Sequence, residues 1–172
     1  MSLRTYQEDA VKELVRKSNK LLNLSGNKVC LFRAPTGSGK TIMMADFLKR
    51  LVEYRSDNKS FSFIWAAPRN LHRQSKKKLQ NYYHGNGPLI CSYFEDLMDK
   101  KIQENEILFL NWESINKSDN IYIKDNEQNI NLSSIINNTK EDGREIILVI
   151  DESHHTAQTE TSRKLKIGRA HV

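Results

Sequence analysis

The chain has 172 residues, 38% of them hydrophobic, with seven glycines and three prolines, and 27 Lys and Arg against 21 Asp and Glu give a net charge of +6. This composition is typical of one globular domain, and it excludes a disordered chain and two large domains. The positive charge favours a polyanionic partner such as nucleic acid, although ordinary cytosolic proteins carry similar charge.

The sequence has neither a membrane-spanning run nor a secretion signal. No apolar stretch approaches the length of a membrane span, and the first residues, MSLRTYQEDA, lack the apolar segment of a signal peptide. Cys30 and Cys91 lie in or beside apolar stretches, so we expect reduced thiols that pack as small hydrophobic groups. We therefore expect a cytoplasmic protein without a membrane partner.

Helical and strand-like segments alternate along the chain. Residues 5–22 have apolar side chains at helical spacing, with Thr5 as the expected cap and Glu8 three residues later. Further segments follow in order: a strand KVCLF (28–32), a helix (41–54), a strand SFSFIWAAP ended by Pro68, a helix (70–83), and two strands, EILFLNW (106–112) and EIILVID (145–151). Residues 116–143 are polar and are expected to form a connection with room for one short helix. The alternation predicts an α/β domain whose largely parallel sheet has helices on both faces.

The glycine-rich segment APTGSGKT, residues 34–41, lies where a strand is expected to lead into a helix near Lys40. Backbone amides of such a loop and the positive end of the helix dipole converge on one place, where they favour phosphate. Glycines let the backbone approach the phosphates, the lysine reaches the β- and γ-phosphates, and the threonine hydroxyl ligates Mg²⁺. The strict pattern begins with glycine, where this chain has Ala34, and the competing interpretation is a flexible Gly/Ser loop. The candidate nucleotide-binding residues are Pro35, Thr36, Gly37, Ser38, Gly39, Lys40 and Thr41.

An acidic pair follows the last predicted strand. Five apolar residues, 146–150, lead to Asp151 and Glu152 at the carboxyl end of that strand, the edge at which open α/β sheets bind ligands. Asp151 is expected to hold Mg²⁺ through water, and Glu152 to activate the attacking water as a general base. Two acids after a strand are usually a solvated turn, but together with the lysine loop they predict that Lys40 and Asp151 meet around one magnesium–triphosphate.

The ordered motifs YQEDAV, APTGSGKT, AAPRNLHRQ, NWESINKSDN and DESHH, spread over residues 3 to 163, resemble the first motor domain of superfamily 2 helicases and translocases. The closest resemblance is to the restriction subunit of type III restriction–modification enzymes and to related DEAD/DEAH-like proteins. The resemblance implies a RecA-like P-loop NTPase domain that uses ATP and Mg²⁺ and acts on DNA. Double-stranded DNA is the expected form.

The resemblance also implies roles for individual residues. Gln7 matches the residue that reads the adenine edge, with Tyr6 and Arg4 near the base, and His154 matches the residue that links the γ-phosphate site to a second domain. The segment Pro68, Arg69, Asn70 and Leu71 matches the one that contacts the nucleic-acid backbone. Local chemistry agrees, since helix amides with Arg69, Arg73 and Lys76 suit phosphates, although Lys76–Lys78 fit a solvated helix face equally well.

The chain also departs from this pattern. The Ser-Ala-Thr segment, a second motor domain with its arginine finger and a nuclease domain are missing, so residues 1–166 are interpreted as a truncated first RecA-like domain with weak ATPase activity. Residues 167–172, IGRAHV, are the translation of ATCGGAAGAGCACACGTC, a common sequencing adapter, and are expected to be a non-native tail. The expected partners are DNA, the missing second domain, and a methyltransferase or specificity subunit.

Several other functions are compatible with parts of this sequence. Within the same class these are an RNA helicase and a type I restriction motor. A P-loop kinase for a small metabolite would share the glycine loop, but it would not explain DESHH or AAPRNLHRQ. A nucleic-acid-binding module with a vestigial nucleotide loop would bind DNA without binding ATP.

Overall fold

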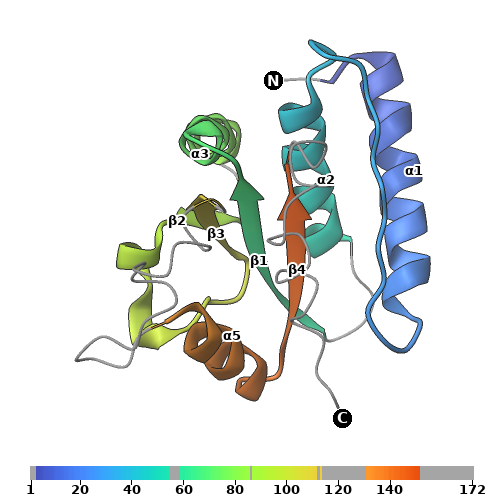
Figure 1. The fold of residues 1–172 in the computed structure, drawn as a ribbon. Helices are drawn as coiled ribbons and strands as arrows, with labels where there is room; N and C mark the ends of the chain where they lie inside the picture. Colours follow the sequence, from blue (N-terminus) through green and yellow to red (C-terminus); the bar gives the residue numbers. More distant parts are fainter. Residues whose placement is uncertain (1–2, 55–58, 86, 112, 114–130, 152–172) are drawn as a thin grey trace. The chain divides into compact units, whose positions relative to one another are not determined.

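The computed structural model describes residues 3–54, 59–85, 87–111, 113 and 131–151 (Figure 1). The chain forms two compact units, which are described separately. The first contains the described residues of 1–57 and 78–88, and the second contains those of 58–77 and from 89 onward. Within the described part, no helix is long and apolar enough to cross a membrane.

Two helices, α1 (Thr5–Leu22) and α2 (Lys40–Glu53), pack side by side in the first unit (Figure 1). Their apolar residues recur every three or four positions, so each helix has one face that it can bury. Helix α1 buries Val11 and Leu14, and α2 buries Met43, Ala45, Phe47, Leu48 and Leu51. The last turns of α3 (Leu71–Tyr83) also belong to this unit, where the Tyr83 hydroxyl donates to the Ala45 carbonyl at 2.9 Å.

Helix α1 has the expected extent, but its predicted cap is wrong. Thr5 is already helical, and the capping position is Arg4, whose backbone is extended. The Arg4 amide donates to Oε1 of Gln7 at 2.9 Å, so Gln7 fills the place that the sequence suggested for Glu8. Capping depends on which residue leaves the helical conformation first, and here that residue is Arg4.

The predicted strand KVCLF (28–32) is absent. These residues belong to no strand, and the side chains of Val29 and Leu31 are 84% and 62% exposed. The run is apolar and β-branched enough for a strand, but a strand is stable only when a neighbour bonds its backbone. Among the described residues no strand pairs with this segment.

The second unit contains a four-stranded, wholly parallel sheet in the order β2-β3-β1-β4. The strands are β1 (Ser60–Ala67), β2 (Ile90–Ser92), β3 (Glu106–Asn111) and β4 (Arg144–Ile150). Strands β1, β3 and β4 are the predicted ones, whereas β2, with only three residues, was not predicted. Two short 3₁₀ helices, η1 (Phe94–Asp96) and η2 (Met98–Lys100), precede β3.

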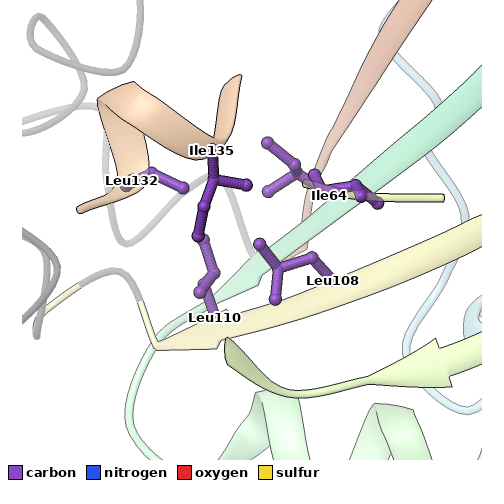
Figure 2. Packing of buried hydrophobic residues seen from close by; sticks show 6 residues of the cluster. Ile64, Leu108, Leu110, Leu132 and Ile135 are labelled. Carbon is purple, nitrogen blue, oxygen red and sulfur yellow. The ribbon is translucent and has the colours of Figure 1, made fainter. Parts of the chain in front are cut away.

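Both faces of the central strands are buried, as in a sheet covered on both sides. On one face, Trp65 stacks on Phe109 with ring centroids 5.9 Å apart. Helix α5 (Leu132–Glu141) packs on the other face, where Ile135 lies among Ile64, Leu108 and Leu110 (Figure 2). Helix α5 is the short helix expected in the polar connection, and its cap is Asn131, whose side chain accepts from the Ser134 amide at 2.8 Å. The predicted α/β fold with a parallel sheet is therefore confirmed.

Candidate nucleotide and nucleic-acid site

The glycine loop turns sharply into helix α2 in the first unit. Ser38 closes a turn by donating its amide to the Pro35 carbonyl at 3.2 Å, and α2 begins at Lys40. Gly37 and Gly39 have φ angles of +76° and +85°, in the left-handed region that side chains with a Cβ rarely adopt. The two glycines of the motif are therefore required by the backbone of this turn.

The loop has properties that suit a phosphate chain. The first amides of a helix find no carbonyl partner within it and give that end a positive potential, and Lys40 and Thr41 begin α2. The Ser38 hydroxyl is buried, with no hydrogen-bond partner among the described residues. A buried hydroxyl without a partner is costly, so a ligand oxygen that bonded it would be stabilising. The donors present here fit a nucleotide, with the Thr41 hydroxyl available to Mg²⁺.

Gln7, the predicted adenine-reading residue, is attached to the same loop. Its Nε2 donates to the Ser38 carbonyl at 2.7 Å, and the Tyr6 hydroxyl donates to the same oxygen at 3.1 Å. A Cβ at Gly39 would lie 2.6 Å from Gln7 Nε2, so this approach also requires glycine. Gln7, Tyr6 and the loop thus form one cluster in the first unit, a link that motif spacing alone could not reveal.

Asp151 lies in the second unit, directly after β4. Its amide donates to the Ala66 carbonyl at 2.9 Å, which extends the pairing of β4 with β1 to the carboxyl edge of the sheet. The buried Ser75 hydroxyl of α3 donates to Asp151 Oδ2 at 3.2 Å. A carboxylate at this edge is a suitable Mg²⁺ ligand. Glu152 and His154 lie outside the described residues.

The corner between β1 and α3 carries the predicted nucleic-acid contacts. Pro68 is buried, whereas Arg69, Asn70 and Arg73 are exposed around the start of α3. Arg69 has a φ of +52°, a left-handed conformation that is unusual for arginine. Exposed cations beside the amino end of a helix can bind the phosphates of a nucleic-acid backbone.

His72 holds this corner from within the protein. Its Nδ1 lies 2.9 Å from the Arg69 carbonyl, which can only accept, so this nitrogen carries the proton. The ring packs edge-on against Tyr93, with centroids 6.3 Å apart. Burial, together with a smaller effect of the Arg73 charge, lowers the His72 pKa below its usual 6.5, so this histidine is neutral at pH 7.

The prediction that Lys76 contributes to a phosphate-binding edge is wrong. Lys76 is buried, and its Nζ lies 3.9 Å from the centre of the Tyr93 ring and 3.8 Å from Asp96 Oδ2. A lysine enclosed by an aromatic face and a carboxylate is a structural cation. Of the three lysines 76–78, only Lys77 and Lys78 form the exposed helix face.

The predicted site residues therefore fall into two groups. The glycine loop and Gln7 lie together in the first unit, and Asp151 lies with the β1–α3 corner in the second. The meeting of Lys40 with Asp151 stays a prediction. Sequence reasoning missed Ser75, for which there was no signal, because a serine inside a helix reveals its partner only after the strands are in register.

A comparison with protein families matched residues 1–169 to the family described as "Type III restriction enzyme, res subunit". No curated protein and no solved structure gave a match. The family match covers nearly the whole chain, and it agrees with the parallel sheet and with a glycine loop at the start of α2. The chain belongs to the family of type III restriction enzyme res subunits, and it is a RecA-like P-loop domain of the helicase-like ATPase type, the amino-terminal motor domain of superfamily 2.

Proposed function

We propose that this domain is the ATP-binding half of an ATP-dependent DNA translocase that serves a type III restriction enzyme in the cytoplasm. The observation that carries the proposal is the turn at Gly37 and Gly39, which opens α2 and leaves the buried Ser38 hydroxyl without a partner among the described residues. Family membership makes a helicase-like motor the expected setting for this turn.

In this proposal Lys40 would stabilise charge on the β- and γ-phosphates, and Thr41 and Asp151 would hold Mg²⁺, Asp151 through water. Glu152 takes a proton from the attacking water, and His154 transmits the state of the γ-phosphate to a second motor domain. Bound Mg²⁺ would neutralise the charge that develops on the transferred phosphoryl group.

DNA is the proposed substrate along which this motor moves. Arg69, Asn70 and Arg73 are exposed at one end of α3, where they can contact backbone phosphates without reading bases. Such contacts suit a motor that moves along double-stranded DNA of any sequence. The proposed partners are a second RecA-like domain and a methyltransferase or specificity subunit.

The first test is nucleotide binding by the chain itself, measured with a fluorescent ATP analogue. Lys40→Ala should abolish binding, because the phosphates lose their main cationic partner. Lys49→Ala is the matched control, since Lys49 lies on the same helix and pairs with Glu53 at 3.8 Å. Equal binding by wild type and Lys40→Ala would contradict the nucleotide site and favour a vestigial loop.

A second test separates a motor from a kinase. In the parent enzyme that we propose to contain this domain, ATPase activity should rise when double-stranded DNA is added. A flat response would favour the P-loop kinase, and a response to RNA alone would favour an RNA helicase. Glu152→Gln should retain ATP binding and abolish hydrolysis, whereas continued turnover would contradict Glu152 as the base.

A further inference from the structure

We propose that the ion pair between Glu8 and Arg50 sets the adenine preference of the nucleotide site, because it fixes Gln7 against the glycine loop. The inference rests on the proposed function in one respect, namely that Gln7 reads the base. Glu8 is then a positioning residue that acts through its neighbour and contacts no nucleotide itself.

The contacts around Arg50 form a continuous network within the first unit. Arg50 Nη1 and Nη2 donate to the two carboxylate oxygens of Glu8 at 2.8 and 2.6 Å, and Arg50 Nε lies 2.6 Å from Asp46 Oδ2. The Tyr82 hydroxyl donates to the other oxygen of Asp46 at 2.6 Å. Two-point pairing of arginine with a carboxylate is among the strongest and most directional polar contacts in proteins.

Charge distribution agrees with this geometry. The hydrogen bonds from Arg50 hold the pKa of Glu8 below its usual value, and the same contact raises the pKa of Arg50. Burial and the neighbouring Asp46 carboxylate raise the pKa of Tyr82, so its hydroxyl remains a donor. Arg50 therefore bridges the carboxylates of Asp46 and Glu8.

The first turn of α1 depends on polar contacts for its position. Val11 is the first buried residue of the helix, and Tyr6 is 49% exposed, so no buried apolar side chain anchors the turn that carries Gln7. Tyr6 and Gln7 bond the Ser38 carbonyl, and Glu8 bonds Arg50. Helix α2 carries Arg50 and begins at the glycine loop. The ion pair therefore fixes the position of Gln7 relative to the proposed phosphate site.

The side-chain amide of Gln7 lies close to the backbone of Gly39. An added Cβ on Gly39 would approach Gln7 Nε2 to 2.6 Å, which shows how closely the amide lies against the loop. A glutamine amide recognises adenine by donating to N7 and accepting from the N6 amino group, a pattern that guanine cannot offer. Loss of the ion pair should therefore weaken binding of ATP while it leaves binding of GTP, which depends on the phosphate contacts alone.

The experiment measures dissociation constants of the chain for Mg-ATP and Mg-GTP by competition with a fluorescent nucleotide. Glu8→Ala should raise the constant for ATP about tenfold, the order expected for a lost charge-assisted contact, and should change that for GTP less than about twofold. Glu13→Ala is the matched control, since Glu13 makes a similar two-point pair with Arg16 on α1, at 2.7 Å for each bond, away from the loop. It should change neither constant.

The ratio of the dissociation constants for ATP and GTP tests the positioning role of Glu8. An unchanged ratio of the two constants in Glu8→Ala, or an equal loss for ATP and GTP, would overturn the proposal, since the second result is what a merely structural role gives. Glu8→Gln keeps an acceptor for Arg50, so it should fall between wild type and Glu8→Ala, and it carries the test if the alanine variant does not fold. Gln7→Ala tests the adenine role separately from the positioning role. If Gln7→Ala keeps the preference for ATP over GTP, Gln7 does not read adenine. If Gln7→Ala loses this preference and Glu8→Ala keeps it, Gln7 reads adenine but Glu8 does not position it.

Discussion

The Ser75 hydroxyl donates to Asp151 Oδ2 at 3.2 Å, so helix α3 contacts the acid at the end of β4. The same helix begins beside Arg69 and Asn70 and carries Arg73. One element therefore joins the proposed DNA-contacting corner to the proposed magnesium ligand, and both lie in the second unit.

Ser75→Ala should weaken the use of magnesium by the parent enzyme. Partners that orient a ligating carboxylate typically contribute ten- to a hundredfold to metal affinity, and we expect the lower end, about tenfold, because only one bond is lost. The measurement is the Mg²⁺ concentration for half-maximal ATP hydrolysis. Gln74→Ala, an exposed neighbour on α3, is the control. An unchanged magnesium requirement in Ser75→Ala would show that the bond does not position Asp151.

Gly39→Ala should abolish nucleotide binding and lower stability. The φ of +85° costs an alanine about 1–2 kcal/mol, and the new methyl group would also displace Gln7. Gly26→Ala separates the two effects, because Gly26 has a φ of +77° but nothing within 4 Å of an added Cβ. Chemical unfolding and ATP binding should show similar backbone strain in both variants and loss of binding in Gly39→Ala alone. Normal binding by that variant would mean that the close approach of Gln7 is dispensable.

Arg73→Ala and Lys76→Met should separate DNA contact from structure on one helix. The exposed Arg73 is expected to bind a phosphate, so its loss should weaken binding to all DNA sequences and reduce the slope of log K against log salt by about 1. Lys76, enclosed by Tyr93 and Asp96, should contribute about 1 kcal/mol to stability and nothing to DNA affinity. Titrations at several salt concentrations and urea unfolding measure the two effects. A loss of DNA affinity in Lys76→Met equal to that in Arg73→Ala would reverse the assignment.

The sequence was sufficient where a single physical rule determines the result. Continuous apolar runs predicted β1 and β3, because strands buried on both faces must be apolar throughout. The same kind of run predicted β4, although β4 is only partly buried. The glycines of the loop were also informative, because glycine adopts the φ angles of +76° and +85° found in this turn at the least steric cost.

The rest depended on partners that a linear pattern cannot specify. Residues 28–32 have a strand-like sequence, but no described strand pairs with them, and Lys76 belongs to a basic run although Tyr93 encloses it. The bonds from Ser75 to Asp151 and from Glu8 to Arg50 join residues 76 and 42 positions apart. Such contacts exist only after the elements have packed.

Ile135→Ala should be strongly destabilising, because Ile135 is fully buried between α5 and the strands (Figure 2). Removal of three carbons from such a site typically costs about 2–5 kcal/mol through lost burial and the cavity that remains. Ile136→Ala is the control, since Ile136 is only partly buried beside the same cluster, and it should cost less. Urea unfolding monitored by tryptophan fluorescence gives both values. Equal costs would argue against the packing of α5 on this face.

The neutral state of His72 should make stability fall in mild acid. Burial depresses the pKa of His72 in the folded protein, so as the pH falls the unfolded chain takes up a proton near the ordinary pKa of 6.5 before the folded protein does. The free energy of unfolding is therefore independent of His72 well above pH 6.5. It decreases as the pH falls from 6.5 through the lower pKa of the folded state. His72→Asn keeps an N–H donor for the Arg69 carbonyl but cannot titrate, so it should flatten the pH dependence of the unfolding free energy in this range.

The matched control is His84→Asn, because His84 is exposed. Urea unfolding at intervals between pH 7.5 and about 5 measures the slope for all three proteins, and the range spans the usual titration of histidine. A slope that persists between pH 7.5 and about 5 in His72→Asn would contradict the assignment of the acid sensitivity to His72. Carboxylates such as Glu8 and Asp142, whose pKa values are lowered by Arg50 and Lys101, respond in a different range. Their contribution is lost only at lower pH, as the pH falls from the ordinary carboxylate range through their depressed pKa values, so the position of the slope identifies the titrating group.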